Sequence, residues 1–401
     1  MTRILIDLTH TSHTRTNTGI QRVGRALYGA LRERPDEVLP VCHDPYESTW
    51  RLLRRRERDN LAPPQVKAAG ARGGRWPLPA RISGLLRRWL GIRAQSRFPG
   101  ALPGDWLIVP EIFSPVVGNA FPSLFAGISG PRVAIFHDAI PLRLPELSPH
   151  KTVARFPGYL QELLRFDGIA ANSADSQTTL VEYWRWLGIA DPPPVISLPL
   201  GIDRPAPAPF GHTTATDAPP VVLCIGSIEG RKNHLALLEA CETLWQRGLR
   251  FDLQLIGLAR PETGGPALDR VRALQAAGRP LRYDGPASEN DLARAYRACA
   301  FTVYPSLMEG FGLPVLESLS YGKPCICSAQ GALGESTQGG GCLTLSPIDA
   351  PAIAEAIAVL LSDPEHLEDL ATEAHNRTFK TWSIYAEELA AWIRTLKRRN
   401  T

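Results

Sequence analysis

The chain has 401 residues, a length typical of two or three domains. Its 44% hydrophobic and 21% charged residues exclude a mostly disordered protein. The net charge of +4 is too small to indicate a nucleic-acid-binding protein, and no run of 18 apolar residues predicts a membrane-spanning helix. The N-terminus has no long apolar core of the kind that a signal peptide needs, so we expect a cytoplasmic protein.

The first half alternates short apolar runs with helical patterns. A strand is predicted at residues 4–8, followed by a polar loop and a helix over 19–31. The loop, residues 10–17, is dense in His, Thr and Arg. Further strands are predicted at four apolar runs: residues 106–109, 133–136, 168–171 and 195–198.

A basic stretch interrupts this half. Residues 51–100 hold thirteen lysines and arginines against Glu57 and Asp59, a local charge of +11, so the rest of the chain carries −7. Within it, residues 81–93 place apolar side chains at helical spacing with arginines between them. Two interpretations stay open: an amphipathic helix on an anionic membrane surface, or a helix that docks on its own domain with a solvated arginine face. Nucleic acid is the least favoured partner.

The second half repeats the pattern after a Pro-, Ala- and Thr-rich linker, residues 204–220. Predicted strands and one predicted helix then follow in the order 221–225, 233–247 (the helix), 253–256, 301–304 and 324–327. Two such runs predict an α/β protein with two Rossmann-like, doubly wound parallel sheets. We expect domains at 1–203, with 51–100 as an insertion, and at 204–375. We also expect a C-terminal helix within 376–401 that packs back on the N-terminal domain.

The seven cysteines predict buried free thiols in a reducing compartment. Only Cys325 and Cys327 are close in sequence. In a strand, a C-x-C spacing points both side chains to one face rather than into a closed zinc site.

Two loops that follow strands of the second half carry the chemistry, because ligands of doubly wound sheets bind beyond the carboxyl ends of the strands. The first loop runs from Gly226 and Ser227 to Arg231, Lys232 and Asn233, where a helix is expected to begin. Glycines, two cations and a helix N-terminus with Asn233 as its N-cap form an anion site, most naturally for a pyrophosphate. A surface Arg-Lys pair beside an ordinary turn is the alternative.

The second loop brackets a Gly-Phe-Gly turn with two carboxylates. Glu309 lies in the loop, and Glu317 lies about one turn into a helix that begins near Leu313 and Pro314. Two acids flanking close backbone N–H groups could bind a ligand with hydroxyl groups at both ends.

Together these motifs resemble the retaining glycosyltransferases of family 4, which have the two-domain GT-B fold, with the two domains facing a cleft. The resemblance is strong over residues 220–335 and looser elsewhere. It implies that a nucleotide-sugar donor binds mainly to the second domain and that the first domain lies on the acceptor side. Arg231 and Lys232 would hold the pyrophosphate, with Gly226 and Ser227 in the same loop. Glu317 would bind the ribose.

The resemblance also assigns the sugar. Glu309 and the backbone of the turn would bind the hydroxyl groups of the transferred hexose, through Gly310, Phe311, Gly312 and Leu313. His137, at the end of the strand that reads VAIFHD, would approach the donor sugar. A structural histidine is the alternative.

The segment of residues 17–22 resembles the glycine loop of members that transfer mannose. Gly19 would let the backbone approach the diphosphate from the first domain. This pattern favours GDP-mannose as the donor. We expect an acceptor that is a glycan or lipid-linked oligosaccharide, in bacterial-type surface polysaccharide assembly such as that of lipopolysaccharide. We also expect the loop of residues 10–17 to contact this acceptor.

No D-x-D motif occurs, so the sequence predicts no metal and no cofactor. Cationic side chains and helix termini would stabilise the leaving diphosphate instead. No side chain is an obvious covalent nucleophile. Two rivals stay open: a nucleotide-sugar epimerase of the same fold, and a non-catalytic nucleotide-sugar-binding assembly protein.

Overall fold

The computed structural model describes residues 2–15, 19–62, 76, 81–82, 84, 86, 89–90, 105–202 and 218–399. The chain forms two compact units. The first comprises Met1–Asp138, Ala154–Gly201 and Trp382–Thr401, and the second comprises Ala139–Val153 and Ile202–Thr381. The expected linker falls almost wholly on residues outside the described part.

In the described part of the first unit, one sheet has the order β3-β2-β1-β4-β5-β6-β7. Its strands are β1 Arg3–Asp7, β2 Glu37–Asp44, β3 Thr49–Leu52, β4 Trp106–Val109, β5 Arg132–Phe136, β6 Gly168–Ala171 and β7 Val195–Ser197. All neighbouring pairs are parallel except β2 with β3. The central strands β4, β5 and β6 are buried throughout, as continuous apolar runs of a two-sided sheet should be.

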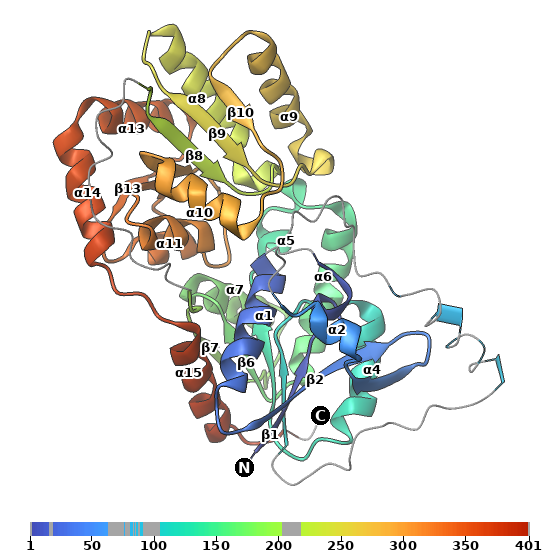
Figure 1. Cartoon of the computed structure of the whole chain (residues 1–401). Coiled ribbons are helices and arrows are strands. Elements are labelled where there is room, and N and C mark those ends of the chain that lie inside the picture. Colours follow the sequence, from blue (N-terminus) through green and yellow to red (C-terminus); the bar gives the residue numbers. More distant parts are fainter. Residues whose placement is uncertain are drawn as a thin grey trace. The chain divides into compact units, whose positions relative to one another are not determined.

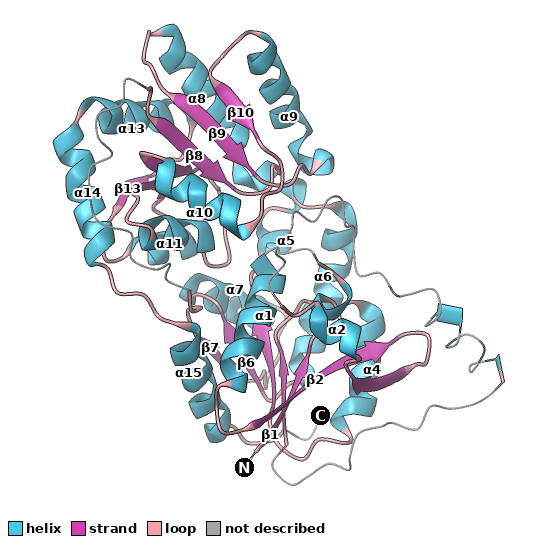
Figure 2. Ribbon diagram, viewed as in Figure 1, coloured by secondary structure: helices cyan, strands magenta, loops and turns pink. Residues whose placement is uncertain are grey.

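Helices cover both faces of this sheet (Figure 2). They are α1 Gly19–Arg32, α2 Arg55–Asp59, α4 Pro115–Phe125, α7 Ala174–Trp186 and α15 Trp382–Thr395, together with most of α6 His150–Glu162, whose first residues are assigned to the second unit. Two 3-10 turns also belong to the first unit: η1 Thr11–His13 and η3 Leu163–Arg165.

The C-terminal helix α15 belongs to the first unit because it buries one stripe there. Its buried residues recur at helical spacing: Trp382, Tyr385, Ala386, Leu389, Ala390 and Ile393. The tail after it is also held, since the Arg399 N–H donates to Asp167 at 2.6 Å and the Arg132 side chain donates to the Arg399 carbonyl at 2.9 Å.

The second unit contains, among its described residues, a parallel sheet of order β10-β9-β8-β11-β12-β13. Figure 1 labels β8, β9, β10 and β13 of this sheet. The strands are β8 Val221–Ile225, β9 Asp252–Ile256, β10 Leu281–Tyr283, β11 Phe301–Tyr304, β12 Cys325–Ser328 and β13 Cys342–Leu345. The helices are α5 Ile140–Arg143, α8 His234–Gln246, α9 Pro261–Ala276, α10 Glu289–Ala298, α11 Leu313–Ser320, α12 Gly331–Thr337, α13 Ala350–Ser362 and α14 Pro364–Asn376, and the 3-10 turns are η2 Pro145–Leu147 and η4 Gly230–Lys232.

Two hydrophobic layers enclose this sheet. Side chains of α8, α9 and α13 form the main core with β8 and β9, through residues such as Leu237, Leu268 and Ile357. Side chains of α10 and α11 pack on the other face, in clusters around Tyr296 and Val315. This doubly wound arrangement is the one that the alternating pattern predicts.

The structure differs from some expectations. The sequence does not predict strands β2 and β3, because Pro40 interrupts the apolar run of β2 and β3 lies at the start of the basic stretch. The segment Ala139–Val153, expected in the first domain, belongs to the second unit. The cysteines are free thiols, as predicted, and both Cys325 and Cys327 point into the core beneath α11.

Within the part of the chain that the structure describes, no helix has both the length and the apolar content to cross a membrane.

Candidate functional site

The strand order of the second sheet reverses where β8 meets β11. The two strands are neighbours, with Phe301 in register with Val222, although β9 and β10 lie between them in the chain. Such a reversal is where doubly wound sheets bind ligands, beyond the carboxyl ends of the two strands. The loop after β8 and the loop after β11 therefore lie side by side.

The loop after β8 packs tightly on its neighbours. Gly226 donates its N–H to the Ile256 carbonyl at 2.9 Å. A Cβ on Gly257 would lie 1.8 Å from the Gly226 carbonyl oxygen, so a larger residue at 257 would force the loop after β9 away from the loop after β8. A Cβ on Gly226 itself would lie 3.7 Å from the Tyr304 ring and 3.9 Å from the Lys232 side chain. The loop thus passes directly over the end of β11.

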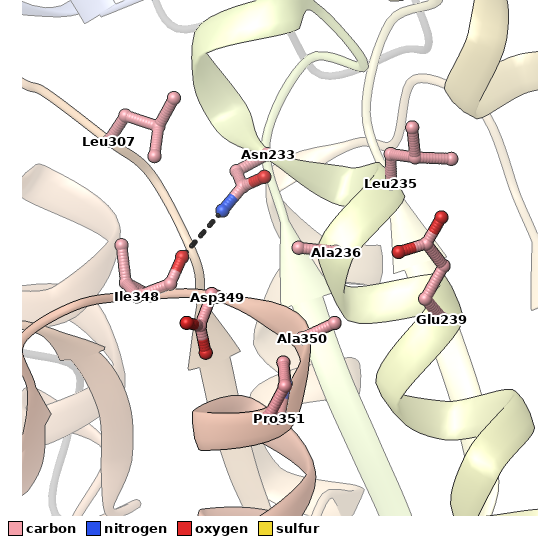
Figure 3. A pocket seen from close by; sticks show the side chains of 9 residues that line it. All are labelled: Asn233, Leu235, Ala236, Glu239, Leu307, Ile348, Asp349, Ala350 and Pro351. Atoms are coloured by element: carbon pink, nitrogen blue, oxygen red, sulfur yellow. Dashed lines mark hydrogen bonds between the residues drawn. The ribbon is translucent and has the colours of Figure 1, made fainter.

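The expected N-cap at Asn233 is wrong in one respect. Asn233 does stand before α8, but it adopts a left-handed backbone with φ 54° and makes no side-chain cap hydrogen bond. Its side-chain amide instead donates to the Ile348 carbonyl at 2.9 Å, ahead of α13 (Figure 3). A 3-10 turn, η4, supplies Arg231 and Lys232 just before the helix.

A pocket of about 500 Å³ opens beside Asn233 (Figure 3). It is lined by Asn233, Leu235, Ala236, Glu239, Leu307, Ile348, Asp349, Ala350 and Pro351. None of the predicted donor-binding side chains lines it, so this pocket is distinct from the charged cluster described next.

The loop after β11 turns into α11 as the sequence predicts. Gly312 stands at the N-cap with φ 95°, a left-handed conformation that favours glycine, and Pro314 lies in the first turn. A Cβ on Gly312 would lie 3.0 Å from Leu333, and Ser336 donates its hydroxyl to the Phe311 carbonyl. Helix α12 therefore supports the Gly-Phe-Gly turn from behind.

The two loops meet in a cluster of charged side chains. One oxygen of Glu309, Oε1, accepts from Arg231 at 2.8 Å and from Lys232 at 2.6 Å. The loops are also joined through their backbones, since the Leu307 N–H donates to the Arg231 carbonyl at 2.9 Å. The three residues that the motifs singled out separately thus form one site.

Burial sets the electrostatics of this cluster. Burial by itself would raise the pKa of Glu309, but Arg231 and Lys232 outweigh it and lower that pKa to about 2. Burial lowers the pKa of Lys232, although Glu309 opposes the shift. Arg231 also pairs with Glu229 at 2.9 Å. The cluster therefore holds two cations and two carboxylates, and of these four residues Lys232 is buried.

Two residues of this cluster were missed by the sequence analysis. The Tyr304 hydroxyl accepts from Lys232 and donates to Glu309 at 3.0 Å, and the Ser306 hydroxyl also donates to Glu309. Burial raises the pKa of Tyr304 well above its usual value, so its hydroxyl keeps its proton. Tyr304 ends an apolar run and resembles a core residue. Its position at the carboxyl end of the strand was the signal available.

The second carboxylate lies in different surroundings. Glu317, on α11, accepts a hydrogen bond at 3.2 Å from the hydroxyl of Tyr296, on α10. Tyr296 is buried and stacks on Tyr321 with ring centroids 4.9 Å apart. The two acids of the motif therefore have separate partners, which fits contact with different parts of one ligand.

The predicted residues of the first unit are placed as follows. His137 follows β5 and is buried, and burial lowers its pKa. Its Nε2–H donates to the Pro110 carbonyl at 2.7 Å, and Asn172 donates to its Nδ1 at 3.0 Å. Both ring nitrogens are thus hydrogen-bonded to residues of the first unit. Gly19 begins α1, and a Cβ added there would meet no heavy atom within 4 Å, while residues 17 and 18 lie outside the described part.

The polar loop of residues 10–17 is mostly buried structure, as far as it is described. Glu111 accepts from the backbone N–H groups of His10 and Thr11, both at 2.8 Å. His13 lies 3.0 Å from Glu57, and the Ser12 carbonyl accepts from Asn60 at 2.8 Å. The described part of this loop is thus held by internal hydrogen bonds, and its contact with an acceptor stays a prediction.

Among the described residues, one group has metal-ligand atoms within 4.8 Å of one another: His13, Cys42 and Glu57. Arg51 already donates to both oxygens of Glu57, at 2.7 and 2.8 Å. A guanidinium in that position takes the place of a bound cation, so the group is better described as an ion pair than as a metal site.

The architecture is that of the GT-B fold, and comparison with solved structures confirms this prediction. A sucrose-phosphate synthase from Thermosynechococcus elongatus superimposes with a TM-score of 0.67 at 18% identity, covering 98% of each chain. Anabaena Alr3699/HepE, solved with UDP and glucose, has a TM-score of 0.67 at 17% identity and covers 98% of this chain and 99% of that one. At these identities the likeness concerns the fold.

Comparison of sequences shows which class of enzyme the chain resembles. Residues 210–377 match the family model of glycosyl transferases group 1. The serotype-specific mannosyltransferase WbdA of Escherichia coli is 25% identical over 354 residues, which are 81% of this chain and 38% of the relative. The O-antigen chain mannosyltransferase B of Escherichia coli is 37% identical over 145 residues, which are 35% of this chain and 36% of the relative. The chain thus spans less than half the length of these relatives in the matched regions.

Proposed function

We propose that the protein is a retaining glycosyltransferase of the family 4 type that takes a hexose from a nucleotide-diphosphate sugar. The observation that carries this proposal is the cluster of Arg231, Lys232 and Glu309 where the strand order reverses, inside the segment that matches the glycosyl transferase model. A pair of cations, of which Lys232 is buried, beside glycine-rich backbone suits a diphosphate, and a carboxylate suits sugar hydroxyl groups.

In this proposal Arg231 and Lys232 stabilise the charge that grows on the diphosphate as the glycosidic bond breaks. Each such contact contributes about 2.7–4 kcal/mol in comparable electrostatic sites. Glu317 binds the ribose, while Glu309 and the backbone of residues 310–313 bind the hexose. Gly226 and Ser227 allow the diphosphate to approach the loop after β8.

The proposed reaction keeps the anomeric configuration. The acceptor hydroxyl enters on the face from which the diphosphate leaves, a diphosphate oxygen takes its proton, and the new bond forms to the anomeric carbon. The chain has no D-x-D motif, and we propose that the cationic pair makes a metal unnecessary. His137 and Gly19 keep the donor-side roles that the family resemblance implies. A sugar contact by the His137 side chain would require Nε2 to leave the Pro110 carbonyl.

For the substrates, we propose GDP-mannose and a glycan or lipid-linked oligosaccharide of a surface polysaccharide. Support comes from the glycine loop at residues 17–22 and from relatives whose names describe mannosyltransferases of serotype-specific and O-antigen chains. We also propose peripheral attachment of the protein to the inner face of the cytoplasmic membrane, where such an acceptor would be reached.

A panel of nucleotide sugars tests the proposal. A ligand present at 100 times its Kd stabilises a folded protein by about 2.7 kcal/mol, so the true donor should raise Tm measurably. We expect GDP-mannose to give the largest shift, and slow hydrolysis of the donor without acceptor to show catalysis. Stabilisation without any hydrolysis or transfer would favour the non-catalytic binding protein, and conversion to an isomeric nucleotide sugar would favour the epimerase.

A further inference from the structure

Residues 81–90 of the basic stretch present an apolar face to solvent. The backbone is helical at most of the described positions, and the Leu90 N–H donates to the Leu86 carbonyl at 2.9 Å. The exposed fractions of the side chains are 55% for Ile82, 52% for Leu86, 82% for Trp89 and 60% for Leu90. Four large apolar side chains exposed on so short a segment are unusual on a protein surface and indicate a partner.

The opposite side of this helix is the side that docks on the protein. Gly84 is buried against Tyr46, where an added Cβ would lie 2.4 Å from the Tyr46 Cβ. The Arg81 guanidinium lies 5.8 Å from the centre of the same ring. Ile82, Leu86, Trp89 and Leu90 are exposed, whereas Gly84 is buried. The described residues of this segment therefore dock through Gly84 and leave an apolar stripe, formed by Ile82, Leu86, Trp89 and Leu90, exposed to solvent.

Exposed arginines of the same basic stretch stand on a well-anchored support. Helix α2 and the residue before it expose Arg54, Arg55, Arg56 and Arg58. The helix is anchored by Glu57, which accepts from Arg51 at 2.7 Å and lies 3.0 Å from His13. Trp76 stacks on His13 with ring centroids 3.8 Å apart. The charge of +11 over residues 51–100 is thus combined with an outward apolar stripe.

We propose that Ile82, Leu86, Trp89 and Leu90, together with the exposed arginines of α2, form a surface that binds anionic lipid bilayers. An exposed aliphatic and tryptophan stripe inserts among acyl chains near the headgroups, and arginines are attracted to anionic headgroups. RNA would need the cations but not four exposed apolar side chains. The surface lies wholly in the first unit. It deepens the peripheral membrane attachment proposed above and does not depend on the proposed transfer reaction.

Vesicle sedimentation of the full chain tests this surface. The probes are vesicles of phosphatidylcholine with phosphatidylglycerol and vesicles of phosphatidylcholine alone. Wild-type protein should bind the anionic vesicles at least about tenfold more tightly than the neutral ones, and raising the salt concentration should weaken binding because the screening length falls from about 8 Å toward 3 Å. Trp89→Glu and the pair Arg55→Glu with Arg56→Glu should each lower vesicle affinity at least about tenfold.

Trp186→Glu is the matched control. Trp186 is 79% exposed on α7 of the same unit, outside the proposed surface, so this variant should bind vesicles like wild type. Because Trp89 and Trp186 are both solvent-exposed, neither variant should change Tm, which separates lost binding from lost folding.

Four results would overturn the proposal. The first is absence of binding to anionic vesicles, and the second is equal binding to both vesicle types. The third is an equal loss of vesicle affinity in the Trp89 and Trp186 variants. The fourth is an RNA homopolymer that displaces the vesicles and still binds Trp89→Glu. A dimer of wild-type protein that Trp89→Glu dissociates, without any vesicle binding, would assign the stripe to a second copy of the chain. Donor hydrolysis, measured on the same variants, reports on the transfer proposal separately.

Discussion

Replacing Tyr304 with Phe removes a single hydroxyl group from the centre of the charged cluster. That hydroxyl accepts from Lys232 and donates to Glu309 at 3.0 Å, and the Tyr304 side chain is buried. The ring itself stays, so its packing against the Lys232 side chain, whose Nζ lies 4.6 Å from the ring centre, is retained. The variant therefore tests the orientation of the lysine and the carboxylate rather than the volume of the core.

The magnitude follows from the two bonds lost. Hydrogen bonds to charged groups contribute about 1.5–3 kcal/mol each, but Lys232 and Glu309 remain paired with each other at 2.6 Å and keep part of that energy. A net loss of about 2 kcal/mol in orientation of the ammonium corresponds to about a 30-fold weaker interaction with a diphosphate. We expect the Kd of the nucleoside diphosphate, measured by calorimetry, to rise by about 10- to 30-fold.

Tyr385→Phe is the control. Tyr385 is fully buried in α15 of the first unit, and its hydroxyl has no hydrogen-bond partner among the described residues. Loss of that hydroxyl should leave nucleotide affinity unchanged and Tm equal or slightly higher. If Tyr304→Phe binds the nucleoside diphosphate within about twofold of wild type, Tyr304 only packs, and the reasoning about orientation is wrong.

Four further expectations concern residues of the second unit. Lys232→Ala should lower kcat more than it raises the donor KM, because its charge acts on the leaving group, and a rate within about threefold of wild type, under about 0.7 kcal/mol, would exclude that role. Glu317→Gln should weaken binding of the free nucleoside diphosphate while Glu309→Gln damages transfer without weakening it; equal weakening in calorimetry would refute their separate assignments. Gly312→Ala should destabilise the protein by about 1–3 kcal/mol, because φ is 95° and the new Cβ would press on Leu333. The control Gly265→Ala, on α9, places its Cβ in open space and should raise Tm. Equal changes in Tm for the two variants would refute this reasoning. The pKa of Glu309 is depressed from 4.5 to about 2 in the folded protein, so this carboxylate stabilises the fold by an amount on the order of 3 kcal/mol above pH 4.5. That contribution is lost as the pH falls toward 2. In acid titrations the free energy of unfolding should therefore fall less steeply in Glu309→Gln than in wild type.

Several features of this protein could be read from the sequence because their signals are local. Apolar runs followed by glycine loops and helical periodicity predict two doubly wound sheets, and the turn from Gly312 into α11 carries its own glycine and proline signals. The loops that hold Arg231, Lys232 and Glu309 were identified for the same reason, since each follows a strand that the sequence reveals. Whether a residue lies on a helix, a strand or a loop is determined largely by the few residues next to it in the sequence.

Other features depend on residues that are distant in sequence. Glu309 pairs with Arg231 and Lys232 across 78 and 77 positions, and Glu57 meets His13 across 44. The Asn233 amide donates to the Ile348 carbonyl instead of capping its own helix, and both ring nitrogens of His137 are held by residues of other elements. A side chain with several possible partners takes the one that the topology brings close, and no local propensity encodes that choice.

The sequence by itself thus determined which residues could do chemistry and on which loops they lie. Only the tertiary structure decided which of them meet, because β8 and β11 become neighbours through the order of the sheet rather than through the order of the chain. The same holds for residues 81–90. Their composition allowed either a docked or an outward apolar face, and in the structure Gly84 packs on Tyr46 while the side chains of Ile82, Leu86, Trp89 and Leu90 are exposed.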